Sequence, residues 1–459
     1  MRPLPSSESE YTEHRALRLF VGTWNVNGKT PRESLAPWLT DGSGRGVDLP
    51  DLYVVGLQEM VDLSVTNVTI GGATSKKASK EWTALIETAL NDAAAASGDG
   101  SAGDRYEVLT SRCLVGLNIV AFVKARFRQH ISDVQDAEAP VGIMGVMGNK
   151  GGAFLLFVVL HRTPRPRGAA ARRHPPRPLS SPLPPGVSIR LRIFDSTLCF
   201  VCAHLAAHRG AVAQRNADFA SIMAKTEFRD DAKAEAGALA AARGVAGADG
   251  IGRVAIADHD FVIWLGDFNY RIVETLATER CFELALGGDA ELEQLRARDQ
   301  LNIERAATRA FFGFHEAPLS FRPTYKFQAG TNLYEQRPDK KLRAPAWCDR
   351  ILWRCSPDID AKYLRQLYYG SADELLLSDH KPVHALFEVG VRTVLRDRRA
   401  AVVSDITRQL DAMENRSMPK VCKRLRRSRR SSHGAAPRLA RPAPRRAAPR
   451  RAAPARRST

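Results

Sequence analysis

The segment from Phe261 to Ile272 constrains the fold more than any other part of this 459-residue chain. It begins with an apolar run, FVIWL, and becomes polar at Gly266, Asp267 and Asn269. Such a run is typical of a strand buried on both faces, and the glycine marks its end. The strand therefore delivers a carboxylate and a carboxamide to the edge of a sheet. A tight turn after a core strand is the simpler alternative.

Four other segments repeat this pattern of an apolar, β-rich run that stops at polar residues. They are LFVGTWNVNGK with Asn25 and Asn27, DLYVVGLQEM with Gln58 and Glu59, LCFVCAHLAAH with His204 and His208, and LLLSDHKPV with Asp379 and His380. Functional side chains commonly gather where strands of a layered sheet end. The five segments together predict one large α/β domain whose strand ends converge on a single cleft.

The formal net charge of +18 is unevenly distributed. Residues 420–459 carry 15 lysines and arginines and residues 161–187 carry 6, with no acid in either segment, so the remainder has a net charge of −3. Both segments are rich in Arg and Pro and lack an apolar period, so we expect neither to join a packed core. Residues 161–187 are either a surface insertion between two adjacent strands or the product of a retained intron or gene-model error. The tail is either functionless or an electrostatic anchor for anionic lipid or nucleic acid.

Apolar spacing predicts helices over 80–97 and 291–305, one or two helices over 211–244, and two strands within 105–132. These elements carry no dinucleotide or P-loop fingerprint. The glycine-rich GVMGNKGG lacks the Walker spacing and is more simply a turn that brings Lys150 close to an anion.

The seven cysteines show no zinc-finger spacing, and no signal peptide precedes them, so we expect a reduced, intracellular protein. The longest apolar stretch, AFLLFVVL, is too short to span a bilayer. Any membrane contact would therefore be peripheral.

Cationic and aromatic residues gather in two further segments. PTYKF places Tyr325 beside Lys326, and KKLRAPAWCDRILW places Lys341 and Arg343 ahead of Asp349. A lysine supplies a point charge and an arginine a two-pronged grip, so this set suits a small, highly phosphorylated ligand. Each residue alone is more often a solvated surface charge, but their clustering between polar strand ends favours a binding site.

Eight motifs now stand in order, namely WNVNG, GLQEM, GNKGG, AHLAAH, WLGDFNYRI, PTYKF, RAPAWCDRILW and SDHKPV. Together they resemble the inositol polyphosphate 5-phosphatases of the endonuclease/exonuclease/phosphatase superfamily, which also includes deoxyribonuclease I. The resemblance implies a four-layer α/β sandwich, in which two mixed β-sheets are flanked by helices.

The resemblance also implies a domain organisation. It covers residues 17–390 as a catalytic domain, interrupted by the insert at 161–187, after a disordered N-terminus at 1–16. Residues 391–419 resemble the helical linker that follows the catalytic domain in type II members related to the Lowe syndrome protein. The basic tail at 420–459 stands where those members carry further domains, which puts the partners of those domains in doubt.

For the reaction, the resemblance assigns Mg²⁺ to Glu59, helped by Asn25, with Asp379 completing the metal side. Hard oxygen ligands suit this cation, and its charge offsets the charge that develops on a phosphoryl group. Asp267 would orient or deprotonate the attacking water.

The remaining catalytic roles concern charge on the phosphoryl oxygens. Asn269, His204 and His380 would donate to the non-bridging oxygens as charge builds. Asp349 would pair with His380 and fix its tautomer and charge.

Substrate binding is assigned to six residues. The family pattern places Tyr325, Lys326, Lys341 and Arg343 on the phosphate next to the scissile one, and we add Lys150 and His208 as further ligand-binding residues. These donors distinguish a compact inositol phosphate pocket from the long groove that a nuclease needs.

The sequence thus predicts a Mg²⁺-dependent phosphatase that removes the 5-phosphate from phosphatidylinositol 4,5-bisphosphate and related lipids or soluble inositol phosphates. A nuclease or other phosphodiesterase of the superfamily and a non-catalytic lipid-binding module are the alternatives. We expect a cytoplasmic monomer that visits an endosomal, Golgi or plasma membrane, with an anionic lipid surface as its partner through the basic tail. Nucleic acid is not an expected partner.

Overall fold

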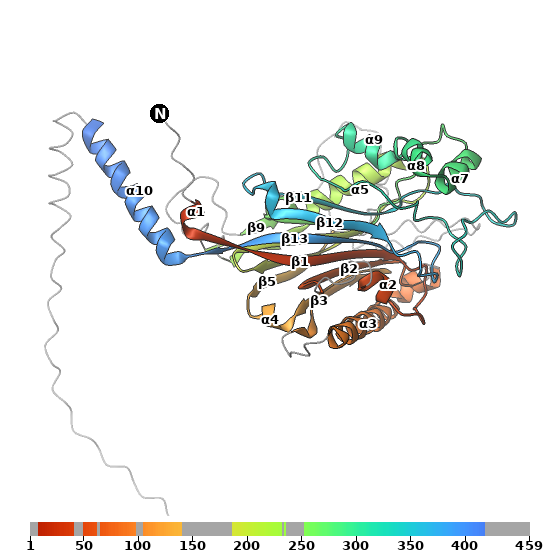
Figure 1. Ribbon diagram of the computed structural model, residues 1–459, viewed down its shortest axis with the longest axis horizontal. Helices are drawn as coiled ribbons and strands as arrows, with labels where there is room; N and C mark the ends of the chain where they lie inside the picture. The colour runs from red at the N-terminus through yellow and green to blue at the C-terminus, as the bar shows by residue number, and fades with distance from the viewer. Residues whose placement is uncertain are drawn as a thin grey trace, which may run out of the picture. The chain divides into compact units, whose positions relative to one another are not determined.

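The computed structural model describes residues 8–40, 49–61, 65–97, 104–139, 186–231, 234–235 and 252–417 (Figure 1). Lys150, nearly all of the insert and the tail at 420–459 lie outside these residues. By internal contacts the chain divides into one unit at 13–393 and a second made of both terminal segments. Within the described residues, no helix has the length and hydropathy that crossing a bilayer requires.

The larger unit contains two mixed β-sheets. The first has six strands in the order β12 (Leu364–Ser371), β13 (Val383–Val394), β1 (Thr12–Asn25), β2 (Leu52–Gln58), β4 (Leu117–Lys124) and β3 (Tyr106–Leu114). The second has five strands in the order β11 (Asp349–Cys355), β10 (Phe261–Asp267), β7 (Ser196–His204), β6 (Gly186–Ile193) and β5 (Ile131–Glu138). Parallel pairing of β1 with β2 and of β10 with β7 makes both sheets mixed.

Apolar side chains fill the space between the sheets and cover both outer faces. Alternate residues of β1 illustrate this, because Leu19 and Val21 join the inner core while Phe20 and Trp24 join the outer cluster. A strand with two buried faces reads as a continuous apolar run, which explains why the strand segments are recognisable in the sequence.

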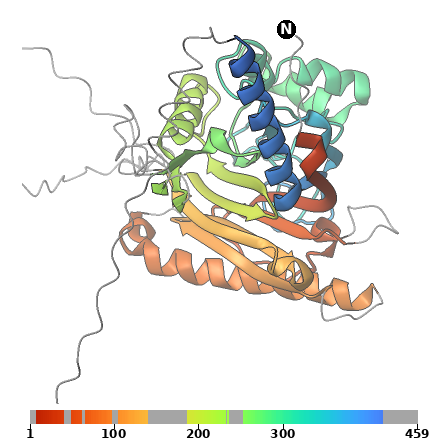
Figure 2. The same ribbon diagram turned by 90° about the vertical axis from the view of Figure 1, so that its left-hand side faces the viewer.

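Helices cover the outer faces of the two sheets. On the first sheet lies α3 (Val65–Ala96), whose Trp82, Ile86 and Leu90 join the outer cluster. On the second lie α5 (Val212–Lys225) and α9 (Gln300–Ala306), whose Phe219, Ile222 and Leu301 join the cluster on that face. The buried residues of α7 (Thr278–Leu286) and α8 (Asp289–Arg296) belong to the inner core instead. Figures 1 and 2 show α3 on one outer side of the paired sheets and α5 and α9 on the other. This order of layers confirms the predicted four-layer sandwich.

Short elements complete the larger unit. They are α2 (Ala36–Leu39), α4 (Ala125–Arg128), two 3₁₀ turns at Ile256–Asp258 and Ala361–Tyr363, and a small sheet of β8 (Glu227–Arg229) and β9 (Arg253–Ala255).

The smaller unit contains α1 (Glu8–Tyr11) and α10 (Arg396–Ser417). The backbone N–H of Leu395 donates to the carbonyl of Tyr11 at 2.8 Å, immediately before α10 begins.

Of the one or two helices expected over 211–244, the first is α5, which ends at Lys225 because the chain becomes extended where Phe228 is buried and β8 pairs with β9. Residues 231, 234 and 235 are helical again, and 236–244 lie outside the described residues. Another predicted helix differs from the structure. The helix expected over 291–305 is broken between α8 and α9. There the carboxylate of Asp299 accepts from the N–H of Asn302 at 2.9 Å and caps a new helix. The strands within 105–132 are confirmed as β3 and β4, and the helix over 80–97 is the end of the longer α3.

The two sheets are in tight contact at Gly56 of β2. A Cβ at this position would lie 2.6 Å from Cys202 Sγ and 2.9 Å from Leu265 Cδ1, both on the second sheet. A side chain here would push the sheets apart.

We therefore predict that Gly56→Ala lowers the free energy of unfolding by about 1–3 kcal/mol, as overpacking of a core does. Urea unfolding followed by tryptophan fluorescence measures this loss. Because Cys202 Sγ makes the tightest contact, the loss should be smaller when Gly56→Ala is made in a Cys202→Ala background. Equal losses in the two backgrounds would contradict this explanation.

Candidate active site

Strand register brings polar strand ends together in each sheet. In the second sheet, Asp267 at the end of β10 pairs with His204 of β7 and with Asp349 of β11. In the first sheet, Asn25 at the end of β1 pairs with Gln58, and Glu59 follows at once. Each sheet therefore presents a row of polar groups at one edge.

The two rows meet across the gap between the sheets. Asn25 Nδ2 of the first sheet lies 3.1 Å from Asp267 Oδ2 of the second. His380, in the segment before β13, reaches the same carboxylate, with its Nε2 3.9 Å from Asp267 Oδ2. The predicted convergence of the strand ends on one site is thus present in the structure.

Gly266 allows β10 to carry Asp267 to this position. Its φ is +143°, and a Cβ on it would lie 2.0 Å from the carbonyl oxygen of Ala203 on β7. No side chain fits there, so the glycine that ends the apolar run is required by the close approach of the two strands.

Backbone strain gathers at the same edge. Residues with a φ between +50° and +78° include Asn27, Glu59, His208 and Asn269, each one to four residues beyond the end of a strand. A positive φ is uncommon for residues other than glycine. Residues with this conformation are frequent at active sites, where the surrounding structure holds side chains in fixed orientations.

Asp267 is the centre of the arrangement. It is only 1% exposed, and donors surround its carboxylate. Asn25 Nδ2 and the backbone N–H of Asn269 donate at 3.1 and 3.0 Å, and His204 Nε2 lies at 3.5 Å. These donors compensate the burial of a charge that would otherwise be costly.

Glu59 and Asn25 form the part of the site best suited to a metal ion. Asn25 Nδ2 also donates to Glu59 Oε1 at 3.0 Å, so two carboxylates converge on one amide group. The Glu59 side chain is 34% exposed, whereas Asp267 is buried. Two carboxylates and a carboxamide are hard oxygen donors and fit a cation such as Mg²⁺ or Ca²⁺.

A second group of potential ligands is already engaged in hydrogen bonds. One ligand atom each from Asp267, Asp349 and His380 lies within 4.8 Å of the others. However, His380 Nδ1 donates to Asp349 Oδ2 at 2.9 Å, and Thr324 Oγ1 donates to the same oxygen at 2.7 Å. These residues therefore form a buried carboxylate–histidine pair, which matches the predicted pairing.

The carboxylate of Asp349 controls the charge of His380. Burial alone would lower the pKa of His380, but the ion pair with Asp349 and the charge of Asp267 raise it to about 10. The imidazole is therefore protonated at neutral pH and presents Nε2–H towards Asp267.

Asn269 is held from both sides. Its Nδ2 donates to the carbonyl of Leu205 at 3.1 Å, and its Oδ1 accepts from Arg271. One amide hydrogen is left over for a ligand, because an amide nitrogen carries two.

Tyr325 links this site to a group of cations. Its ring lies 4.5 Å from the ring of His380, the guanidinium of Arg271 lies 4.3 Å from its centroid, and Arg343 donates to its hydroxyl. The neighbouring Lys326 pairs with Asp379 at 2.9 Å. Asp379 is therefore paired with Lys326, a residue predicted to bind phosphate. The predicted role of Asp379 as a metal ligand stays a prediction.

Beyond Tyr325 lies a pocket of about 350 Å³, which we call the cationic pocket. Its lining residues are His208, Arg209, Gly210, Arg271, Glu274, Thr278, Lys341, Leu342, Arg343 and Ala344. Three residues predicted to bind substrate therefore share one pocket, namely His208, Lys341 and Arg343. Burial, followed by the positive charges of Arg343 and Lys341, lowers the pKa of His208, so this ring is neutral.

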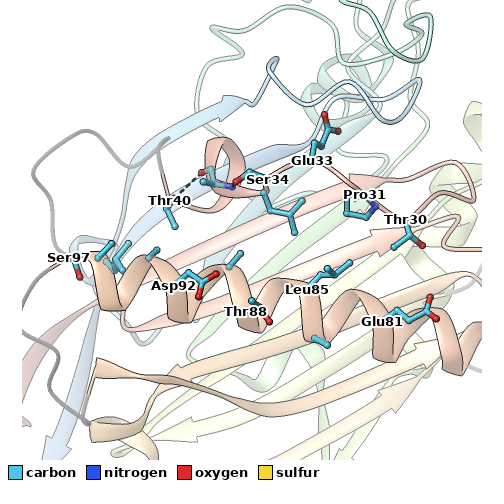
Figure 3. Close-up of a pocket in the computed structure, with 17 residues that line it drawn as sticks. Thr30, Pro31, Glu33, Ser34, Thr40, Glu81, Leu85, Thr88, Asp92 and Ser97 are labelled. Carbon is cyan, nitrogen blue, oxygen red and sulfur yellow. Dashed lines mark hydrogen bonds between the residues drawn. The ribbon is translucent and has the colours of Figure 1, made fainter.

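A larger cavity lies apart from this site. It measures about 1000 Å³ and is bounded by the segment from Thr30 to Thr40 and by one face of α3 (Figure 3). None of the predicted site residues lines it, so cavity size alone does not identify the active site.

Two residues with no role predicted from the sequence lie in the site. Arg271 and Thr324 both lie inside motifs that the sequence singles out, next to Tyr270 and Tyr325. A third, Arg215, is fully buried and donates to the carbonyls of Ala206 and His208 at 3.0 and 2.6 Å. It therefore fixes the loop after β7.

The sequence profile of Endonuclease/Exonuclease/phosphatase family 2 matches residues 22–163 and 185–386. The break between the two matched ranges falls inside the Pro- and Arg-rich segment.

Curated relatives point to one branch of this family. Type II inositol 1,4,5-trisphosphate 5-phosphatase of Mus musculus is 32% identical over 91% of this chain and 34% of that protein. Type I inositol polyphosphate 5-phosphatase 8 of Arabidopsis thaliana is 31% identical over 82% of this chain and 71% of that protein. Synaptojanin of Caenorhabditis elegans is 28% identical over 87% of this chain and 30% of that protein. The chain spans about a third of the length of the mouse and nematode relatives.

Solved structures agree on the fold. A Cimex nitrophorin variant, solved as a ferrous NO complex, is 17% identical with a TM-score of 0.51, covering 82% of this chain and 99% of that one, which indicates a shared fold alone. The inositol polyphosphate 5-phosphatase domain of SPsynaptojanin, in complex with inositol (1,4)-bisphosphate and calcium ion, is 28% identical with a TM-score of 0.63. That match covers 90% of this chain and 96% of that one. These matches confirm the resemblance seen in the motifs, and the chain belongs to the inositol polyphosphate 5-phosphatase family.

Proposed function

We propose that this chain is a Mg²⁺-dependent phosphatase that removes the 5-phosphate from phosphatidylinositol 4,5-bisphosphate, related phosphoinositides or soluble inositol polyphosphates. One observation carries the proposal. A buried carboxylate surrounded by donors, Asp267, is joined to a compact cationic pocket through Tyr325, which packs on His380 beside the carboxylate and accepts from Arg343 of the pocket. The pairing suits a substrate with two adjacent phosphates.

The dimensions of the pocket favour a phosphorylated ring over a nucleic acid. A volume of about 350 Å³ accommodates a small ligand, and its cations converge on one space. A nuclease needs a groove that follows a long polyanion. The nuclease alternative is therefore less well supported by the described residues.

Mg²⁺ would be held by Glu59 with the help of Asn25. When bound, it would supply positive charge that offsets the charge developing on the phosphoryl oxygens. The SPsynaptojanin domain contains a calcium ion, which supports a divalent cation in this family. We favour Mg²⁺ because this cation is usually held by one or two protein carboxylates together with the phosphate of a substrate.

The side chains of the site would then activate the attacking water and donate hydrogen bonds to the phosphate. Asp267 accepts a proton from the attacking water as its oxygen bonds to phosphorus. The bond between phosphorus and the inositol oxygen breaks, and that oxygen takes up a proton from solvent. His204 and the protonated His380 donate to the non-bridging oxygens, where the negative charge grows. Asn269 holds Asp267 through its backbone N–H.

We also propose peripheral association with an anionic membrane through residues 420–459. The support is the sequence itself, which places 15 lysines and arginines and no acid in this segment. A cluster of basic residues is attracted to anionic lipid, and added salt weakens this attraction.

Asp267→Asn should lower kcat for release of phosphate from inositol 1,4,5-trisphosphate by about 10³-fold or more, because the amide cannot accept the water proton. Phosphate release with Mg²⁺ and with chelator measures the effect. The amide keeps the shape of the side chain, so the melting temperature should change little. A variant that retains turnover would contradict the role of Asp267, and hydrolysis of DNA but not of the trisphosphate by the wild type would favour a nuclease.

Asp349→Asn should move the alkaline limb of the pH–rate profile to lower pH by about 1–3 units. The folded-state pKa of His380 is raised to about 10, so the imidazolium stabilises the native state and donates to phosphate until the pH rises through that value. Without the carboxylate, burial lowers the pKa of this histidine. An alkaline limb that does not move would show that His380 does not act as the proton donor.

Deletion of residues 420–459 should weaken binding to phosphatidylserine-containing vesicles by about tenfold or more at low salt. Sedimentation with vesicles measures binding, and neutral phosphatidylcholine vesicles are the control. Hydrolysis of the soluble trisphosphate should stay unchanged. Vesicle binding that survives the deletion would contradict the anchoring role of the tail.

A further inference from the structure

The cationic pocket has a single acidic residue, Glu274, among its described lining residues. Arg209, Arg271, Lys341 and Arg343 contribute positive charge, whereas Glu274 contributes the only carboxylate. An anion in a pocket suited to phosphate opposes the ligand that the rest of the pocket attracts.

The backbone around Glu274 is held in place by Arg209. The guanidinium of Arg209 donates to the carbonyls of Ile272, Val273 and Leu276 at 2.8, 2.5 and 2.7 Å. These three bonds fix the turn that carries Glu274. The backbone from which the Glu274 side chain extends is therefore held at the pocket.

Glu274 lies against Gly210 in the wall of the pocket. A Cβ on Gly210 would lie 3.1 Å from Glu274 Oε1. Glu274 and Gly210 also line a second hollow of about 240 Å³, which contains none of the predicted catalytic residues. Arg271 and Arg343, by contrast, contact Tyr325 on the catalytic side.

The carboxylate is not neutralised within the described part of the chain. Glu274 is exposed, and no hydrogen bond or ion pair there engages its side chain. The nearby arginines are committed elsewhere, because Arg209 binds backbone carbonyls and Arg271 binds Asn269. The negative charge of Glu274 therefore faces the pocket.

From this geometry we propose that Glu274 is a specificity-determining residue that disfavours substrates with one more phosphate on the ring. The inference rests on the proposed function. With the 5-phosphate at Asp267 and the 4-phosphate among the cations beside Tyr325, the next ring position is the 3-position, and in this orientation its substituent would enter the part of the pocket that Glu274 lines. A hydroxyl there can donate to the carboxylate, whereas a phosphate dianion is repelled.

The test compares kcat/KM for two soluble substrates, inositol 1,4,5-trisphosphate and inositol 1,3,4,5-tetrakisphosphate. Glu274→Gln should raise the ratio of tetrakisphosphate to trisphosphate kcat/KM by about 3- to 10-fold at low salt. The increase should shrink as salt is added, because screening weakens repulsion at an exposed site. Asp358→Asn is the matched control, since Asp358 is exposed and lies beyond the opposite end of β11 from Asp349, and it should leave the ratio unchanged.

The outcomes separate this inference from the proposed function. Turnover by the wild type with the same ratio in Glu274→Gln overturns the inference alone. An equal rise of the ratio in Asp358→Asn also overturns it, because net charge would then explain the effect. Failure of the wild type to hydrolyse either substrate overturns the proposed function and the inference with it.

Discussion

The buried carboxylate of Asp267 sets the requirement that the surrounding structure meets. A charge that is only 1% exposed is unfavourable by several kcal/mol unless donors surround it. The donors come from both sheets, with Asn25 from the first and Asn269 and His204 from the second. The two sheets must therefore pack at close range, which Gly56 permits, while Gly266 lets β10 lie close enough to β7 within the second sheet to carry Asp267 to its position. Packing and catalytic geometry are in this sense one constraint.

The strand ends could be predicted because they depend on local patterns, whereas the four layers were implied by the family resemblance of the motifs. A continuous apolar run marks a strand with two buried faces, and the polar residues that follow mark its end, as at Asn25, His204 and Asp267. The break at Asp299 was missed because a buried cap, paired with the distant Arg350 at 3.0 Å, overrides the apolar spacing of the segment. The position of Glu274 was equally hidden, since the clamp from Arg209 spans more than sixty residues.

The fold alone does not decide what this chain does. The Cimex nitrophorin shares the sandwich at 17% identity, and its solved form is a ferrous NO complex. Function depends on the site that a fold carries. Here the carboxylate–histidine pair of Asp349 and His380, the oxygen donors at Glu59 and the cationic pocket lie together at one edge. This combination, rather than the sandwich, supports phosphate chemistry.

The central claim is that the carboxylate at Asp267 faces the 5-phosphate while the cationic pocket holds its neighbour. The most direct measurement is the identity of the product formed from inositol 1,4,5-trisphosphate in the presence of Mg²⁺, determined by phosphorus NMR. With the ring in this orientation, inositol 1,4-bisphosphate is expected as the sole initial product. Release of the 4- or 1-phosphate, or of a mixture, would contradict it, because the pocket would then hold the ring in a different orientation.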